Sequence, residues 1–385
     1  MADLAERADA LWRAIAFLSV AQLHFQASPI AIGQLGTSDL KRRPSGHWGT
    51  VPGTAWALAH AGLAAGCWPE LEVIPVLGAG HAGVVQRALA WLTGDLAKVS
   101  PASSRDAAGL TALVSSFPDA GDLGSEVHPS LPGGAYMGGW LGGALAFAQG
   151  MALDAPARVV IPILGDGECE TPTTAAAWLA QRALTEAHVL PVVHLNGQRM
   201  GGQSLLGAMS DEEVIAYMRG LGWKAVMTHV TTGDPAEHSA FHSAMVTGLD
   251  AARRGERQVI FLRCVKGWSG PTGEHKTPLT DPAGDPRQRA ALSRWLASYR
   301  PSELLDNDGQ PIGSLAAALD GFRLFDPPEA RSAAPGCTSP AGRGFSAEVS
   351  AVLRQHAAFG AFKIFSPDEL RSNRLGGPGA GALGA

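Results

Sequence analysis

Two apolar runs, each followed at once by polar residues, form the clearest pattern along the chain. The first run covers 159–164 and the second covers 189–195, while the stretch between them, 171–188, resembles a helix. A strand, a helix and another strand within this span predict a βαβ unit with a right-handed crossover and parallel strands. The carboxyl ends of both strands would therefore meet at one edge of a sheet, where open α/β sheets bind ligands.

Residues with metal-binding chemistry follow both runs. Asp166 stands between Gly165 and Gly167 after the first run, and Asn196 follows the second run. A carboxylate and an amide oxygen suit Mg²⁺ that carries a phosphate ligand, and glycines let the backbone approach phosphate oxygens closely. The alternative is that Asp166 and Asn196 only cap local backbone turns, and their spacing does not decide between the two interpretations.

The intervening helix has a start signal of its own. Thr171 can cap it and Pro172 suits its first turn, so its first N–H groups would point toward a bound anion. Hydrophobic periodicity and the placement of Gly and Pro predict further helices at 5–26, 54–65, 84–92, 287–299 and 346–359, a loop at 44–53, and strands at 72–77 and 259–262. The pattern as a whole predicts an α/β fold with a doubly wound, mostly parallel sheet.

The composition allows one large domain and argues against some classes of binding partner. Of 385 residues, 46% are hydrophobic and 17% are charged, which is enough for a sizeable core. The net charge is −5 and the only basic run is Lys41–Arg43, which argues against nucleic acid as a partner. The apolar run 14–20 is too short to span a membrane and follows acidic residues, so neither a membrane segment nor a signal peptide is predicted.

The cysteines fit a reducing cytoplasm. Four are present, widely spaced, without the spacing of a disulfide framework or a metal knuckle. Cys169 lies beside the Gly-Asp-Gly string, but no base near it in the sequence would activate it as a nucleophile.

Seven strings of residues, in order along the chain, resemble the N-terminal half of the phosphoketolases, from about residue 12 to residue 375. Gly-Asp-Gly followed by a distant Asn is the signature with which thiamine-diphosphate (ThDP) enzymes hold a metal and a pyrophosphate. The strings are Gly46–Gly53, Gly78–Gly83, Gly165–Thr171, His194–Gly197, Lys266–Pro271, Ser298–Leu304 and Pro367–Leu375. The resemblance implies a ThDP-binding fold of the pyrophosphate type, with ThDP and Mg²⁺ as cofactors.

The family pattern also implies a role for each matching residue. Asp166 and Asn196 fall on the metal ligands, with the backbone carbonyl of Gln198 as a third. The residues implied to bind the cofactor are Gly165, Asp166, Gly167, Glu168, Asn196 and Lys266. The residues on catalytic positions are His47, His81, His275 and Lys266, and those on a substrate-contacting pair are Ser372 and Asn373.

The implied activity is cleavage of a ketose phosphate, either xylulose 5-phosphate or fructose 6-phosphate, with inorganic phosphate. The products would be acetyl phosphate and an aldose phosphate, which makes the protein a carbon–carbon lyase of carbohydrate metabolism. A phosphorylated substrate needs local positive charge, which Lys266 and the histidines could supply. Family active sites form between two protomers, so the resemblance implies a homodimer, or pairing with a second chain that supplies the missing domains.

Two departures from the family pattern leave alternatives open. Tyr136 stands where an active-site histidine is expected, and Met137 and Trp140 replace two glutamates. Because a tyrosine with a pKa of about 10 is a poor proton shuttle at neutral pH, ThDP-dependent aldehyde transfer or ketose-phosphate epimerisation is one alternative. The chain also stops soon after Leu375, before the later family domains. We therefore expect a fragment, a frameshifted product or half of a split enzyme, and an inactive or half-enzyme subunit is the other alternative.

The expected domain organisation follows from the resemblance and from composition. Residues 1–320 would form the ThDP- and Mg²⁺-binding domain, 321–360 a linker with a helix, and 361–385 the start of a second, pyrimidine-type domain. The stretch 325–344 is rich in Pro, Ala, Ser and Gly, which is typical of a linker.

Overall fold

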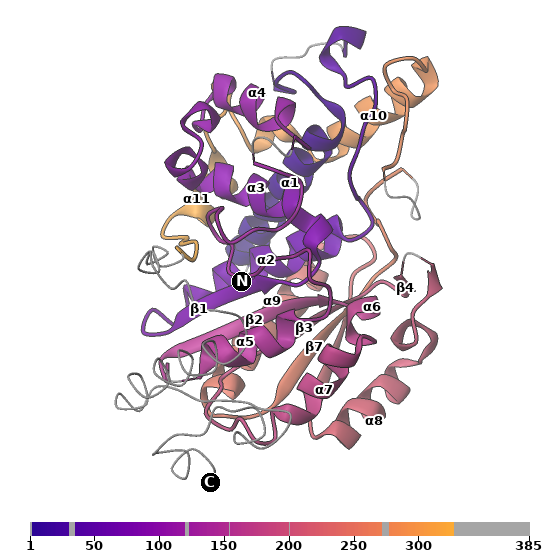
Figure 1. The fold of residues 1–385 in the computed structure, drawn as a ribbon. Coiled ribbons are helices and arrows are strands. Elements are labelled where there is room, and N and C mark those ends of the chain that lie inside the picture. The colour runs from indigo at the N-terminus through magenta and orange to yellow at the C-terminus, as the bar shows by residue number, and fades with distance from the viewer. Residues whose placement is uncertain are drawn as a thin grey trace, which may run out of the picture. The chain divides into compact units, whose positions relative to one another are not determined.

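Among the residues that the computed structural model describes, five parallel strands form a central sheet (Figure 1). They lie in the order β1-β2-β3-β7-β6, and every neighbouring pair is parallel. The strands are β1 (Glu72–Leu77), β2 (Arg158–Gly165), β3 (Val192–Leu195), β6 (Lys224–His229) and β7 (Gln258–Arg263). The predicted α/β fold with a mostly parallel sheet is confirmed, and so is the parallel pairing of the two apolar runs, β2 and β3.

The described residues are 2–30, 35–119, 123–153, 155–199, 201–271 and 277–326. They belong to one compact unit, Met1–Pro327, and the second unit, Pro328–Ala385, lies outside them. The predictions that fall outside the described residues are those for His275, Ser372 and Asn373, the part of the linker from residue 327 to 360 with its helix at 346–359, and the start of a second domain at 361–385.

Helices cover both faces of the sheet, as a doubly wound fold requires (Figure 1). Because successive side chains of a strand point to opposite faces, Ile161 of β2 joins the buried cluster on one face and Val160 joins the cluster on the other. The helices of the first face are α2 (Val51–Ala65) and α9 (Pro235–Arg253), and those of the second are α5 (Ala144–Ala152), α7 (Pro172–Ala180) and α8 (Asp211–Leu221). The sheet is therefore buried on both sides.

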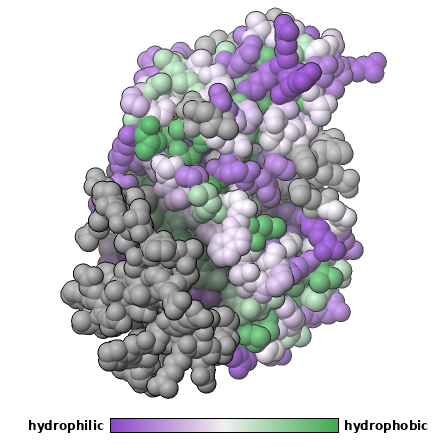
Figure 2. Space-filling view, in the orientation of Figure 1, coloured by the Kyte–Doolittle hydropathy of each residue, from purple (hydrophilic) through white to green (hydrophobic). Residues whose placement is uncertain are grey.

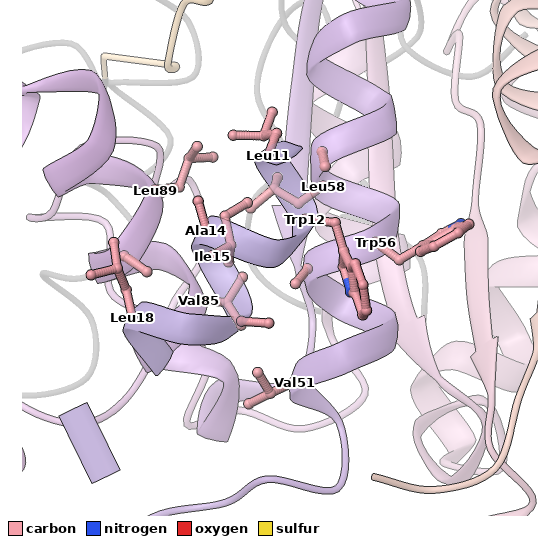
Figure 3. Close-up of a cluster of buried hydrophobic side chains, with 14 of the residues drawn as sticks. Leu11, Trp12, Ala14, Ile15, Leu18, Val51, Trp56, Leu58, Val85 and Leu89 are labelled. Atoms are coloured by element: carbon pink, nitrogen blue, oxygen red, sulfur yellow. The ribbon is translucent and has the colours of Figure 1, made fainter. Parts of the chain in front are cut away.

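Helix α1 (Ala2–His24) lies in a second layer and packs on α2, α9 and α3 (Gly83–Thr93). Figure 3 shows Leu11, Ile15 and Leu18 of α1 packed among side chains of α2 and α3. The remaining helices are α4 (Ala107–Ser115), α6 (Asp166–Cys169), α10 (Pro286–Ser298) and α11 (Gly313–Leu319). The short 3-10 helices are η1 (Thr37–Asp39), η2 (Gly80–Ala82), η3 (Asp95–Lys98), η4 (Pro101–Ser103), η5 (Leu206–Ala208) and η6 (Pro301–Glu303).

Among the described residues, no helix is both long enough and apolar enough to cross a membrane. In the view of Figure 2 the hydrophobic residues of this surface occur in small groups between hydrophilic ones. The small β4 (Gln198–Arg199) and β5 (Gly202–Gln203) pair lies apart from the central sheet and is antiparallel.

The helix predicted at 171–188 is shorter than expected, because α7 ends at Ala180. The side-chain amide of Gln181 donates to the carbonyls of Leu184 and Ala187 and so holds the chain in turns. The predicted start is confirmed, since the Thr171 side chain accepts from the backbone N–H of Thr174 and Pro172 lies in the first turn.

Two other boundaries differ from the prediction. The loop predicted at 44–53 ends at Thr50, because Thr54 N–H donates to the Thr50 carbonyl and α2 begins at Val51. Pro52 fits this first turn, where its missing N–H is not needed. The Gly-Asp-Gly string was predicted as a turn, but Asp166 and Gly167 belong to the one-turn helix α6.

Candidate active site

A cavity of about 420 Å³ opens at the carboxyl edge of the sheet. Every predicted site residue that the structure describes lines it, namely His47, His81, Gly165, Asp166, Gly167, Glu168, Asn196, Gln198 and Lys266. Parallel pairing explains the convergence, because Gly165 at the end of β2 lies opposite His194 near the end of β3. Asp166 and Asn196, each just beyond its strand, therefore reach the same rim.

Asp166 is a buried carboxylate held by the two loops of this rim. Its side chain is 2% exposed. One oxygen, Oδ2, accepts from the Gly197 N–H (2.7 Å) and the Ser204 hydroxyl (2.6 Å), and Oδ1 accepts from the Gly167 N–H (2.9 Å). Burial raises the pKa of the Asp166 carboxyl, although the hydrogen bonds from Ser204, Gly167 and Gly197 oppose that shift. Since a carboxylate offers about four acceptor sites, Oδ1 keeps capacity for a cation.

Asn196 serves the local backbone as well as the cavity. Its Oδ1 accepts from the Gln198 N–H at 3.0 Å, which is the backbone-capping role of the alternative interpretation. The same oxygen retains a second lone pair. Local capping by Asn196 and a place on the cavity wall therefore occur together.

The donor set at the rim suits a hard cation that brings ligands of its own. Among the described residues there is no group of three or more His, Cys, Asp or Glu side chains arranged to hold a metal. The predicted set contains one such side chain, Asp166, with an amide oxygen and a backbone carbonyl. Mg²⁺ bound through one carboxylate, neutral oxygens and the phosphates of a ligand has this character, so the residues present fit the implied group.

Glu168 is a second buried carboxyl at the cavity, and it lies over Gly78. It is 3% exposed and accepts from the N–H groups of Gly142 (3.3 Å) and Gly165 (3.4 Å). A Cβ on Gly78 would lie 2.4 Å from a Glu168 oxygen, so only glycine leaves room for this carboxyl. Burial raises the pKa of Glu168 to about 7, which allows the side chain to hold a proton near neutral pH.

His47 and His81 form a pair on the cavity wall. Their ring centroids are 4.7 Å apart and the rings are tilted by 48°. Burial, with a smaller contribution from the nearby His47 and Lys266, lowers the pKa of His81 to about 4. His81 is therefore neutral at pH 7. The Lys266 side chain passes over Gly49, where an added Cβ would lie 2.7 Å from its Cε.

Three residues near the cavity were not singled out by the sequence. Thr50 and Arg199 line the cavity, and His194 stands behind Thr50. His194 Nδ1 lies 3.4 Å from Thr50 Oγ1, and its Nε2 lies 3.1 Å from Cys264 Sγ. Thr50 and His194 stand within strings that resemble the phosphoketolases, and Arg199 follows Gln198 directly, so proximity to those residues was the available signal.

Tyr136, expected at a histidine position, is not among the described residues that line the cavity. It is 2% exposed, its hydroxyl donates to the Trp140 carbonyl, and burial raises its pKa. Cys169 is also buried, and burial raises the pKa of its thiol well above the ordinary value. Neither side chain is therefore suited to proton transfer or nucleophilic attack at the cavity.

The start of α7, predicted to face a bound anion, is not among the described residues that line the cavity. The cavity wall includes residues of α6 but not the first residues of α7. Thr171 instead caps α7 and packs against Gly142, where an added Cβ would lie 2.1 Å from Thr171 Oγ1.

Comparison with known proteins identifies the family. The model of the XFP N-terminal domain matches residues 2–321. A protein described as a probable phosphoketolase from Streptomyces coelicolor is 37% identical over 339 residues, which cover 81% of this chain and 42% of that protein. Similar proteins from Rhodopirellula baltica and Rhodopseudomonas palustris are each 33% identical, cover 95% and 97% of this chain, and are themselves covered over 52% and 54% of their length. The chain thus spans about half the length of these relatives.

Solved transketolase structures also resemble the chain at low sequence identity. A transketolase variant from Pichia stipitis has a TM-score of 0.49 and 16% identity, covering 96% of this chain and 48% of that one. The transketolase from Leishmania mexicana has a TM-score of 0.48 and 14% identity, covering 78% of this chain and 45% of that one.

The family assignment rests on the sequence matches. From the match over residues 2–321, the chain belongs to the phosphoketolase family, to its N-terminal domain.

Proposed function

We propose that this chain is the cofactor-binding half of a ThDP- and Mg²⁺-dependent phosphoketolase. The reaction is cleavage of xylulose 5-phosphate or fructose 6-phosphate with inorganic phosphate to acetyl phosphate and an aldose phosphate. One observation carries the proposal: the residues implied by the family pattern, as far as they are described, line one cavity at the carboxyl edge of the sheet.

The residues of the cavity have separable tasks in this proposal. Asp166, Asn196 and the Gln198 carbonyl would hold Mg²⁺, and the Gly165–Gly167 backbone would face the diphosphate. Asp166 is fixed for this task, because Ser204 and Gly197 occupy its other oxygen. Bound ThDP supplies a carbon nucleophile and an acceptor for the electron pair released when the ketose carbon–carbon bond breaks.

Protons at the sugar hydroxyls are moved by the histidine pair. Burial keeps the His81 ring neutral at pH 7, so one ring nitrogen can accept a hydrogen bond from a sugar hydroxyl. His47 lies beside it at ring-contact distance and can pass a proton on. Lys266 adds positive charge for a phosphorylated substrate. His275, Ser372 and Asn373 stay predictions from the resemblance, outside the described residues.

The metal assignment is tested by titration with Mg²⁺ and ThDP, comparing the wild-type chain with Asp166→Ala and Asp166→Asn. We expect Asp166→Ala to weaken Mg²⁺-dependent ThDP binding by about a hundredfold, because the only charged ligand is lost. Asp166→Asn should fall between the two, since it keeps an oxygen but loses the charge. Calorimetry measures the affinities, and melting curves without ligand check that each variant is folded.

Asp250→Ala is the matched control for loss of one aspartate. Asp250 lies on α9, away from the cavity, and pairs with Arg253 and Arg254. Its replacement should leave ThDP affinity unchanged. Equal Mg²⁺-dependent binding by wild type and Asp166→Ala would remove Asp166 as the metal ligand.

Tyr136 favours a second candidate activity. Its hydroxyl donates to the Trp140 carbonyl, and Tyr136 is not among the described residues that line the cavity, so the step that removes water from the substrate lacks one proton donor of the family. Aldehyde transfer or ketose-phosphate epimerisation needs no such step. Incubation with each ketose phosphate, followed by separate assays for acetyl phosphate and for isomeric sugar phosphates, distinguishes the activities.

The partner in this proposal is a second copy of the chain or a separate chain that supplies the later domains. Binding of Mg²⁺ and ThDP without turnover favours the half-enzyme alternative. Co-expression with the neighbouring reading frame then tests it, because turnover should appear only when both chains are present.

A further inference from the structure

Arg199 places a permanent positive charge on the cavity wall, and the sequence did not single it out. It lies on β4, beside the turn to β5, and its side chain leaves the backbone next to Gly167. A Cβ added to Gly167 would lie 3.0 Å from the Arg199 Cβ. The start of the arginine side chain therefore lies directly against Gly167 of α6, the residue that follows Asp166.

A single carboxylate holds the guanidinium in this position. Arg199 Nη1 lies 2.8 Å from Glu170 Oε2, and the other Glu170 oxygen accepts from the Leu205 N–H. The Glu170 side chain is 10% exposed, whereas the Arg199 side chain is 53% exposed. Among the described residues no other acceptor contacts the Arg199 guanidinium, so most of its N–H donors remain available to a ligand.

Lys266 brings a second cation to the same wall. Its Nζ donates to the Arg199 carbonyl at 3.4 Å. Arg199 lies on β4 and Lys266 lies in the loop after β7, and both side chains line the cavity. Within the described part of the chain, only Arg199 of these two cations has a carboxylate partner, Glu170, so the two side chains together offer an uncompensated positive charge to an anion.

We propose that Arg199 binds a phosphoryl group inside the cavity, exchanging its bond to Glu170 for the phosphoryl oxygens while Lys266 shares the negative charge. Glu170 holds Arg199 through a single hydrogen bond, from Nη1 to Oε2. A planar guanidinium, in contrast, binds phosphate through two parallel hydrogen bonds. Glu170 holds the Arg199 side chain at the cavity until the anion binds.

The two cations on the cavity wall indicate that the ligand carries a phosphoryl group. Whether this group belongs to the cofactor or to a substrate rests on the proposed function. A diphosphate on the Gly165–Gly167 backbone and a monophosphate on a sugar or free in solution present the same kind of oxygens to Arg199. The inference therefore names the phosphoryl group, and two probes separate the sources. Inorganic pyrophosphate with Mg²⁺ represents the diphosphate, and inorganic phosphate represents the monophosphate.

The test is calorimetric titration of the full chain with each probe, using wild type, Arg199→Met, Arg199→Lys and Glu170→Gln. Arg199→Met should weaken binding of at least one probe by about tenfold or more, as expected for a charged hydrogen bond. Arg199→Lys should recover only part of this loss, because lysine cannot form the two parallel bonds. Glu170→Gln should tighten binding by about threefold, because the competing carboxylate is removed.

Arg158→Met is the matched control. Arg158 also pairs with a glutamate at 2.8 Å, Glu72, but at the start of β2 and outside the cavity. Its replacement removes the same charge and should leave both affinities unchanged. Melting temperatures of all variants show whether each remains folded.

The outcomes separate this inference from the proposed function. A loss confined to pyrophosphate assigns Arg199 to the cofactor diphosphate, and a loss confined to phosphate assigns it to a substrate phosphate. Arg199-dependent binding of either probe by a chain that does not bind ThDP supports the inference and contradicts the proposed function. Equal affinities for wild type and folded Arg199→Met, or no binding of either probe by wild type, overturn the inference.

Discussion

Because Gly53 has no Cβ, α2 can lie directly against the ring of His194. An added Cβ there would be 2.2 Å from the His194 Nε2. The ring cannot move freely, because it contacts Thr50 on one side and Cys264 on the other. We expect Gly53→Ala to destabilise the chain by about 2 kcal/mol, since overpacking costs about 1–3 kcal/mol and outweighs the gain in helix propensity. Urea unfolding of the variant measures the change.

Gly220 provides the opposite case for the same substitution. It lies on α8, is exposed, and an added Cβ would meet nothing within 4 Å. Gly220→Ala should therefore stabilise the chain by about 0.5–1 kcal/mol through helix propensity alone. A stabilising effect of Gly53→Ala that equals this value would show that His194 does not limit the approach of α2.

Site residues could be predicted where a strand end fixes them. Asp166 and Asn196 each follow an apolar run, so the direction of the chain and parallel pairing bring them together. Arg199 lies on a short hairpin outside the central sheet, where no periodicity marks its direction. The position of Tyr136 depends on its bond to the Trp140 carbonyl, which no sequence pattern predicts.

At the scale of elements, caps decide where the peripheral helices begin. Ser210 and Glu213 form a reciprocal cap at the start of α8, in which each side chain accepts from the backbone N–H of the other. We expect Ser210→Ala to cost about 1 kcal/mol, because a backbone donor at the helix start loses its partner. Hydrogen exchange of the α8 amides should then be faster, since this helix packs on β6 at the edge of the sheet.

Ser239→Ala is the control for this prediction. Ser239 is exposed within α9, and its hydroxyl donates to the Pro235 carbonyl one turn earlier instead of capping the helix. Replacement by the better helix former should be neutral or slightly stabilising. An equal loss of stability in both variants would argue against capping as the cause.

The sequence predicts those elements whose ends are marked by a pattern of apolar residues and glycines. β1 was predicted with its observed bounds because its apolar run ends at a glycine. β6 was missed, since it is an edge strand of mixed burial without an apolar run. The end of α7 was placed too late because the turn after it depends on the side-chain bonds of Gln181, which periodicity does not report.

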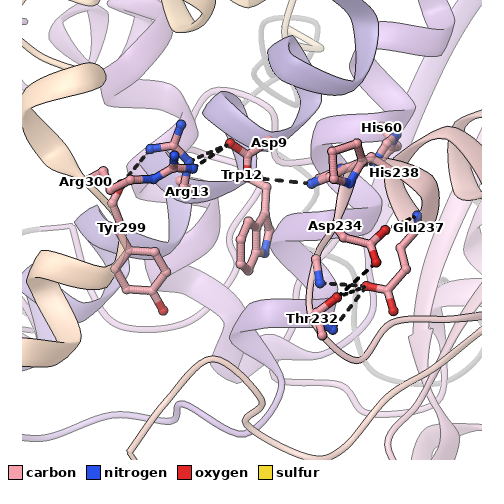
Figure 4. A network of polar contacts seen from close by, with 12 residues as sticks. Asp9, Trp12, Arg13, His60, Thr232, Asp234, Glu237, His238, Tyr299 and Arg300 are labelled. Carbon is pink, nitrogen blue, oxygen red and sulfur yellow. Dashed lines mark hydrogen bonds and ion pairs between the residues drawn. The ribbon is translucent and has the colours of Figure 1, made fainter. Parts of the chain in front are cut away.

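At the scale of the whole molecule, a buried histidine cluster joins α2 to α9 beneath α1 (Figure 4). His60 Nε2 lies 3.0 Å from His238 Nδ1, and the His60 and His242 ring centroids are 5.8 Å apart. The His238 ring stacks on Trp56 at 3.8 Å. All three histidines are therefore enclosed by the packing of helices that are distant in sequence.

Charged groups from α1 and α9 face this cluster. Arg7 and Arg13 of α1 lower the pKa of His242 and His238, respectively, while Glu237 and Asp234 of α9 raise the pKa of His238. Asp9 of α1 also lies 3.9 Å from His238 Nε2. Burial is the largest cause for every member of the cluster and lowers its pKa, to about 4 for His238 and well below the ordinary value for His60.

The cluster should make the chain acid-sensitive, because the unfolded chain binds protons on these histidines that the folded chain does not. Stability is then complete above the ordinary histidine pKa of about 6.5 and falls as the pH decreases from there toward about 4. For His238 alone the loss amounts to about 3 kcal/mol over that interval. Urea unfolding across this range should show a free energy of unfolding that declines with acidification, and the double variant His60→Leu/His238→Leu should have a shallower slope. The control is His229→Gln, at an exposed histidine of β6 that pairs with Asp211, and it should keep the wild-type slope. Equal slopes in wild type and the double variant would show that the cluster is not the source of the acid sensitivity.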